Sequence, residues 1–316
     1  VDIAEDLGLG EETTMVAMFN INRTIMMAAF QLSLPRLPHL GLRPIAASEA
    51  WIGMSRSYDG GLTWSGGFLP GAPFDGSPQS MLSPVKGLEA ATDPVLVAGP
   101  CGQFYVVFVA FTRNDESRIA VARYEDLNND SGGDTIIYKG TTVLETGNNA
   151  EFGYFLDKPD IEIDIMRPQD GENQCAHRLY VSYSTFNGLT KQGKFQSKIN
   201  FAKSEDGGMT FTKSKIQMPY SQNQGSAIAV DPRPGMPTDT DGGGTVYMVW
   251  RHFNDPDAIL MTKSTDGGVK WGKPVVLTDD LPLEAFDQPS ISLDQAVAAD
   301  FPSPVNPGLS REVKAQ

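Results

Sequence analysis

The 316-residue sequence predicts an all-β protein, a β-propeller of four-stranded antiparallel blades. Three observations lead to this prediction. One short motif occurs three times, runs of alternating apolar residues lie between Gly and Pro turn signals, and no convincing helical period is present. The 22 Pro and 32 Gly residues are spread along the chain, which suits many short strands joined by tight turns.

The recurring motif is Ser-x-Asp-Gly-Gly-x-(Thr/Lys)-aromatic, at residues 57–64, 204–211 and 264–271. We call these three segments the repeat turns. The second and third start 60 residues apart (264 − 204), the length of one four-stranded module, and the first and second start 147 apart (204 − 57), which leaves room for two modules and a long loop. A strand-like run ends at each Ser and a short strand follows, so each repeat turn is expected between the third and fourth strands of a blade.

The other strands are expected in the same order in each module. Third strands are expected at Ala50 to Ser57, Ile199 to Ser204 and Ile259 to Ser264. The segment Lys273 to Leu277, after the last repeat turn, is expected to be the fourth strand of its module. Inner strands are expected at Thr13 to Met18, Asp93 to Ala98, Pro159 to Ile165, Ser226 to Val230 and Pro289 to Leu293. Second strands are expected at Thr24 to Phe30, Phe104 to Phe111, Leu179 to Thr185 and Val246 to Arg251.

This pattern gives one domain over residues 1–316, with modules near 11–91, 92–156, 157–223 and 224–287 and part of a fifth at 288–316. We expect either a fragment of a six- or seven-bladed protein, incomplete at its C-terminus, or a smaller ring that the tail closes. A β-sandwich is the runner-up, but it does not explain a recurring hairpin tip. The start at Val1, without an initiator Met, favours a mature or trimmed product.

The polar residues of the repeat turns suggest a structural role. An Asp side chain can accept hydrogen bonds from N–H groups of its own turn, Gly tolerates left-handed dihedrals, and the closing aromatic ring can pack between sheets. The residues concerned are Ser57, Asp59, Gly61, Trp64, Ser204, Asp206, Gly208, Phe211, Ser264, Asp266, Gly268 and Trp271.

The formal net charge of −14 argues against a nucleic-acid partner, because such a partner needs a basic surface. No apolar run is long enough to predict a membrane span. Cys101 and Cys175 precede the second strands of consecutive blades and therefore occupy equivalent turns on neighbouring sheets. We predict a disulfide between them, which fits a secreted protein of an extracellular or periplasmic compartment.

The three repeat turns resemble Asp-boxes, also called bacterial neuraminidase repeats. These occur in sialidases, sortilin-type receptors, some xyloglucan-cleaving enzymes and photosystem assembly factors. The strand order resembles the sialidase-like group most closely. In these families the boxes lie on the rim, away from the active-site face, and the resemblance therefore implies a structural role for Asp59, Asp206 and Asp266.

Sialidases of this fold hold a substrate carboxylate with three arginines and use a Tyr–Glu pair as nucleophile and an Asp as acid/base. Here the first inner strand, near Thr13, carries no arginine. Arg251 resembles the second arginine, but Gln222-Asn223-Gln224 stands where the resemblance implies a glutamate. The third arginine and the tyrosine would lie in later blades. Arg251 has an alternative interpretation as a rim or salt-bridging arginine.

A second set of candidates comes from the starts of the inner strands, which converge on the channel of a propeller. These positions hold Glu12, Asp93, Asp157, Lys158, Asp160, Gln224, Asp287 and Gln288. They are either turn chemistry before Pro or an acidic ring suited to a cation or to sugar hydroxyls. Two of its carboxylates could act as a glycosidase pair at a suitable separation. Arg251, Asp93 and Asp160 are the catalytic candidates.

A loop with alternating oxygen donors raises a calcium hypothesis, although a solvated acidic loop is the simpler interpretation. Its candidate ligands are Asp126, Asn128, Asp130 and Asp134. No other cofactor is expected. The sequence favours a non-catalytic propeller that binds a glycan or an extracellular protein, or acts as a scaffold. The alternative is a glycoside hydrolase of exo-sialidase type with a divergent site. An assembly factor is a weaker third interpretation.

Overall fold

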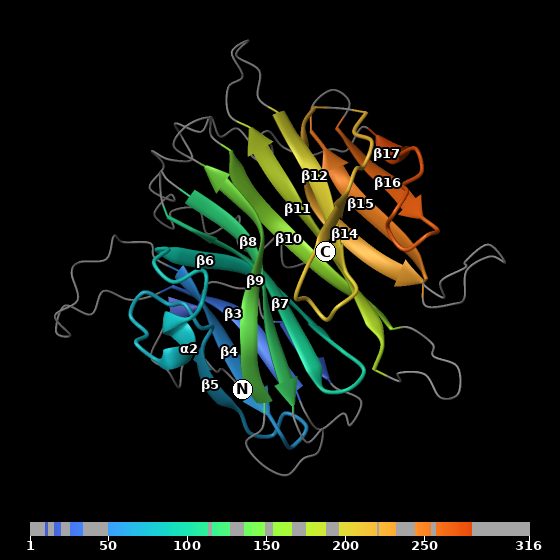
Figure 1. The fold of residues 1–316 in the computed structure, drawn as a ribbon. Coiled ribbons are helices and arrows are strands. Elements are labelled where there is room, and N and C mark those ends of the chain that lie inside the picture. Colours follow the sequence, from blue (N-terminus) through green and yellow to red (C-terminus); the bar gives the residue numbers. More distant parts are fainter. Residues whose placement is uncertain are drawn as a thin grey trace.

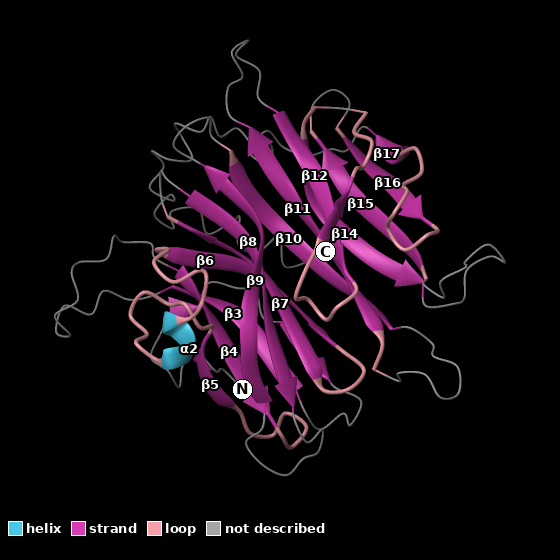
Figure 2. Cartoon of the chain, viewed as in Figure 1, coloured by secondary structure: helices cyan, strands magenta, loops and turns pink. Residues whose placement is uncertain are grey.

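The chain folds into antiparallel sheets that follow one another in chain order, as Figure 1 shows for this computed structural model. The structure describes residues 10–11, 16–19, 26–33, 50–112, 116–126, 136–148, 154–165, 175–187, 196–219, 221–231, 244–253 and 257–279. All statements below concern these residues. Figure 2 shows that nearly all regular structure in them is strand. Within them, no helix has the length and apolar character needed to cross a bilayer.

The strands form four sheets. The first sheet contains β1 (Gly10–Glu11), β2 (Val16–Phe19), β3 (Met26–Ser33), β4 (Ala50–Ser57) and β5 (Ser65–Phe68). The second contains β6 (Ala90–Ala98), β7 (Gln103–Phe111), β8 (Glu116–Asp126) and β9 (Ile136–Asn148). The third contains β10 (Phe155–Ile165), β11 (His177–Asn187), β12 (Gln196–Ser204) and β13 (Thr212–Ser214). The fourth contains β14 (Asn223–Asp231), β15 (Thr245–His252), β16 (Ala258–Ser264) and β17 (Val275–Asp279).

The second, third and fourth sheets confirm the predicted groups of four antiparallel strands. The first sheet differs because it has five strands, with β1 and β2 pairing successive parts of β3. One short helix, α2 (Pro78–Met81), was not predicted. Its four residues are too few to show a helical period, but Ser77 caps its N-terminus and Pro78 opens its first turn. The expected strand at Pro289 to Leu293 lies outside the described residues.

Three apolar layers join the sheets, and β7 shows how the sequence builds them. Phe104, Val106 and Phe108 point toward the first sheet, whereas Tyr105 and Val107 point toward the third. This alternation follows from the two-residue period of a strand. The second sheet is therefore buried on both faces. A third layer, with Phe201, Met248 and Trp250, joins the third sheet to the fourth.

The repeat turns have one geometry at all three sites. In the second, Ser204 Oγ donates to Asp206 Oδ1 at 2.8 Å and accepts from Gly208 N–H at 2.8 Å. Asp206 Oδ1 also accepts from Thr210 N–H at 2.9 Å. Both glycines have positive φ, 68° and 80°. These bonds satisfy the polar groups of the turn internally and lower the pKa of Asp206 to about 2, although burial acts in the opposite direction.

A hydroxyl of the preceding sheet completes two of these turns. Thr142 Oγ1 on β9 donates to Gly208 O at 2.7 Å, and Ser214 Oγ on β13 donates to Gly268 O at 2.7 Å. The second and third repeat turns are thus attached to the outer strand of the sheet before them. In the first repeat turn, Gly61 O accepts instead from Trp64 Nε1 of the same turn, at 3.1 Å.

Candidate functional site

The inner strands β6, β10 and β14 share a β-bulge near their N-terminal ends. The pairing register shifts between Thr92 and Val95, between Asp157 and Asp160, and between Gln224 and Ala227. One residue in each bulge has positive φ: Asp93 at 53°, Lys158 at 49° and Gly225 at 65°. Positive φ is uncommon for Asp and Lys, and such backbone conformations cluster at functional sites. We call the polar side chains of these three bulges the bulge cluster.

The bulge cluster forms a row across three sheets. The Asp157 carboxyl on β10 lies beside that of Asp93 on β6, and Gln224 Nε2 on β14 donates to Asp157 Oδ2 at 3.3 Å. Partial burial is the main cause that raises the pKa of Asp157, and the nearby Asp93 raises it further, while Lys158 opposes the shift. The structure therefore brings together the predicted residues Asp93, Asp157, Lys158 and Gln224.

Asp160 has different surroundings from Asp93. Its Oδ2 accepts from Ile228 N–H on β14 at 2.7 Å, and burial raises its pKa to about 6. A second polar contact between the same two sheets joins Ser226 Oγ to Ser182 Oγ at 2.8 Å. Asp160 therefore helps to hold the third and fourth sheets together. Its partner is a backbone N–H of β14, whereas Asp157 accepts from the side chain of Gln224.

Arg251 lies at the same end of the fourth sheet, directly opposite Gln224 in the pairing of β14 with β15. Its guanidinium forms two hydrogen bonds with Asp257, from Nε at 3.0 Å and from Nη2 at 2.6 Å. It also lies 4.5 Å from the ring centre of Phe253, a distance suited to a cation–π contact. Asp257 thus takes up the parallel N–H donors through which an arginine would bind a substrate carboxylate.

Of the four candidate calcium ligands, the structure describes only Asp126. Asp126 ends β8, is 2% exposed and donates its N–H to Gly102 O at 2.8 Å. Asn128, Asp130 and Asp134 lie outside the described residues, as do Glu12, Asp287 and Gln288 of the inner-strand set. Within the described part of the chain, no three His, Cys, Asp or Glu side chains are placed to hold a metal ion.

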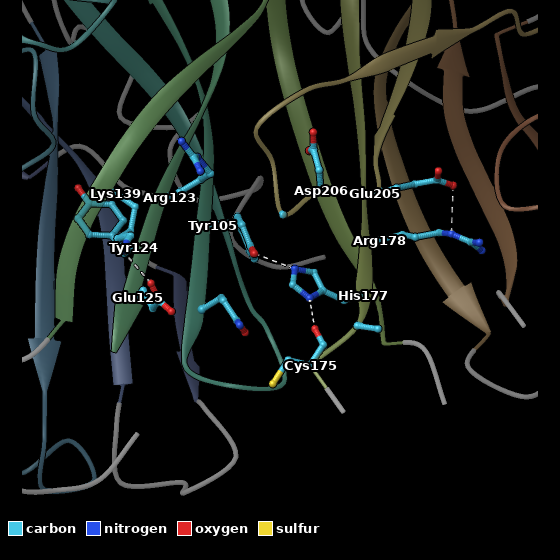
Figure 3. Close-up of a pocket in the computed structure, with 13 residues that line it drawn as sticks. Tyr105, Arg123, Tyr124, Glu125, Lys139, Cys175, His177, Arg178, Glu205 and Asp206 are labelled. Atoms are coloured by element: carbon cyan, nitrogen blue, oxygen red, sulfur yellow. Dashed lines mark hydrogen bonds and ion pairs between the residues drawn. The ribbon is translucent and has the colours of Figure 1, made fainter. Parts of the chain in front are cut away.

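A pocket of about 590 Å³ lies between the second and third sheets at the opposite end from the bulge cluster. Its lining includes Tyr105 of β7, Arg123 of β8, His177 of β11 and Gly207 of the second repeat turn. Figure 3 shows Tyr105 and His177 pointing toward each other, with 2.7 Å between the Tyr105 hydroxyl and His177 Nε2. His177 Nδ1 lies 2.8 Å from Cys175 O and must donate to it, so Nε2 accepts from the tyrosine. Burial lowers the pKa of His177, which favours this neutral form.

The predicted disulfide is confirmed beside this pocket. Cys101 and Cys175 are bonded, with Cα atoms 5.5 Å apart, and join the β6–β7 turn to the segment before β11. Disulfides are typical of proteins from oxidising compartments. The sequence alone does not predict the pocket, because its lining comes from strands and turns of two sheets. The paired turns of Cys101 and Cys175 were the one signal that pointed to this end of the molecule.

No family model matches the chain, and no curated protein matches it. Solved structures do match. A Hadza microbial sialidase has 15% identity and a TM-score of 0.47 over 85% of this chain and 47% of its own. An α-L-arabinofuranosidase from Fusarium graminearum has 12% identity and a TM-score of 0.45, covering 85% of this chain and 68% of its own. An ulvan lyase has 10% identity and a TM-score of 0.44, covering 84% and 55%. The chain thus spans about half the length of the sialidase.

Proposed function

We propose that this chain is a secreted Asp-box propeller of sialidase-like type that binds a glycan at the bulge cluster without cleaving it. The observation that carries the proposal is the row formed by Asp93, Asp157 and Gln224, which gathers carboxylate acceptors and an amide donor from three sheets. Sugar hydroxyls both donate and accept hydrogen bonds, so they suit such a mixed set. The exposed Lys158 adds a further donor at the same bulge.

Aromatic rings beside the row support this assignment. Phe155 stands two residues before Asp157 on β10, on the same face of the strand, and its ring centre lies 6.1 Å from that of Phe111. Both rings are half-buried. A partly exposed aromatic surface next to hydroxyl-binding groups offers an apolar contact for the C–H face of a sugar ring.

Two geometric observations favour binding over hydrolysis. The Asp93 carboxyl lies near enough to that of Asp157 to raise the pKa of Asp157, whereas glycosidase pairs are separated by roughly 5 Å or more so that the sugar fits between them. Arg251 is engaged by Asp257 through two hydrogen bonds, which supports its interpretation as a salt-bridging arginine.

One observation favours the alternative, a divergent glycoside hydrolase. The raised pKa of Asp157 would let this carboxyl keep its proton closer to neutral pH, as a general acid requires. The neighbouring Asp93 could then act as its partner only after the two carboxyls separate around a substrate.

A glycan array together with a hydrolysis panel that includes fluorogenic sialosides tests the proposal. We expect the wild type to bind at least one glycan class and to release no sugar. Asp157→Asn and Gln224→Leu should each weaken binding about tenfold or more, since each removes part of a hydrogen-bonded site. Lys263→Gln, a charge-removing change at an exposed position on β16, should leave binding unchanged.

Two outcomes contradict the proposal. A folded wild type that binds no glycan would exclude a carbohydrate-binding role on the array tested. Sugar release that is lost in Asp157→Asn and in Arg251→Ala would instead establish the hydrolase and give both residues a role in it.

A further inference from the structure

The pocket between the second and third sheets is lined by several charged side chains, which differ in whether they have an ion-pair partner. Most of its charged lining residues are already paired. Lys139 Nζ lies 3.1 Å from Glu125 Oε2, and Arg178 Nε lies 3.4 Å from Glu205 Oε1. Asp206 is satisfied by the donors of its own repeat turn.

Arg123 is the exception in this lining. Among the described residues no acidic side chain pairs with it, and its Nε is buried without a hydrogen-bond partner. Its stem is fixed, because the Cδ and Cγ atoms pack on the Gly208 backbone, 3.2 and 3.5 Å from where a Cβ would lie. The guanidinium therefore cannot easily turn away to solvent. Arg123 is half-buried, and a buried guanidinium nitrogen such as its Nε is normally hydrogen-bonded, since its desolvation is otherwise uncompensated.

The neutral side chains of the pocket add donors. Gln103 Oε1 accepts from Cys101 N–H at 3.0 Å, which leaves the two amide hydrogens of Gln103 to donate. The hydroxyl proton of Tyr105 is used by His177, so the tyrosine offers only its oxygen. Arg123 and Gln103 thus present donors, while the carboxylates in the lining are occupied. Such a site complements a ligand that is rich in acceptors.

We propose that this pocket binds the oxyanion of a small molecule, a carboxylate or a sulfate, through Arg123 and Gln103. An arginine binds planar or tetrahedral oxyanions through parallel N–H donors. The volume of about 590 Å³ is in the range of small-molecule sites. The net charge of −14 opposes anions at long range, but salt screens it beyond about 8 Å, so local donors decide binding. This site is separate from the bulge cluster and does not depend on the glycan proposal.

Isothermal titration calorimetry of the folded protein with sodium sulfate and with sodium glucuronate tests the site, with sodium chloride holding the ionic strength constant. The two probes distinguish a sulfate from a carboxylate ligand. We expect saturable binding of at least one probe, weakened about tenfold or more in Arg123→Gln because a charge-assisted hydrogen bond is lost. Lys263→Gln removes the same charge from an exposed position on β16 and should bind like the wild type.

Gln103→Glu provides a second, independent variant. It keeps an oxygen for Cys101 N–H and replaces the amide donor by a carboxylate, so it should weaken binding about tenfold without touching Arg123, even if Arg123→Gln misfolds. The proposal is overturned by the absence of saturable binding of either probe at millimolar concentration, or by equal affinity in the wild type, Gln103→Glu and Lys263→Gln. Equal weakening in Lys263→Gln would also overturn it, because binding would then be non-specific.

Discussion

Gly268 of the third repeat turn offers a sharp test of how the turns pack. Its φ is +79°, so alanine there carries the strain of a left-handed residue, about 1–2 kcal/mol. The added Cβ would also lie 2.6 Å from Cε1 and Cζ of Phe201. That ring is 1% exposed and lies 4.7 Å from Trp271 in an edge-to-face contact, so it has little room to move. Overpacking of this kind adds about 1–3 kcal/mol, and Gly268→Ala should therefore cost about 2–5 kcal/mol.

Gly60 of the first repeat turn is the matched control. Its φ of +74° gives alanine nearly the same backbone strain, but nothing lies within 4 Å of the added Cβ. Gly60→Ala should therefore cost only about 1–2 kcal/mol. Gly207, with φ +68° and only the Tyr105 hydroxyl at 3.5 Å, should behave like Gly60.

Urea unfolding followed by tryptophan fluorescence and far-UV circular dichroism measures the three free energies of unfolding. Gly268→Ala should unfold at a clearly lower urea concentration than the two controls, with an unchanged dependence on urea. If the three variants lose the same stability within about 0.5 kcal/mol, backbone strain alone explains the cost and the packing argument is wrong.

Three further predictions concern single groups. Ser214→Ala removes two hydrogen bonds at the third repeat turn and should lower the free energy of unfolding by about 1–3 kcal/mol, whereas exposed Thr212→Ala on the same strand should change it little in the same urea assay. The folded pKa of Asp160 is raised to about 6, so the stability that its proton contributes is present below about pH 4 and lost as pH rises through 6. Relative to Asp160→Asn, the wild type should therefore be more stable at about pH 4 than at about pH 7 in parallel urea titrations; equal differences at both would contradict this. Reduction of Cys101–Cys175, which are 74 residues apart, should cost up to about 4 kcal/mol in thermal unfolding, while the double Ser variant should not respond to reductant.

The strands were predictable because each sheet repeats the same local chemistry. The third strand at Ala50 to Ser57 was predicted with its observed bounds, since a repeat turn marks its end. The inner strands were predicted too short, because Pro94 and Pro159 suggest a strand boundary. In the structure each Pro lies inside a bulge, where its missing N–H removes no ladder hydrogen bond, and the strand continues before it.

The candidate sites were less predictable than the fold. Polar residues at the starts of inner strands were expected to converge, but the contact between Asp157 and Gln224 joins residues 67 apart through the packing of two sheets. The role of Arg123 could not be predicted, because an arginine on a strand shows no partner, or lack of one, until the neighbouring sheet is placed against it. Local pattern specifies the strands, and packing between sheets creates the sites.

The hydroxyl contacts between consecutive sheets have a direction. Thr142 and Ser214 each precede in the chain the glycine carbonyl to which they donate. A ribosome makes the chain from its N-terminus, so the supporting strand of each sheet emerges before the turn that rests on it. The sheets can therefore be added one at a time during translation, because Thr142 and Ser214 are in place before the second and third repeat turns fold.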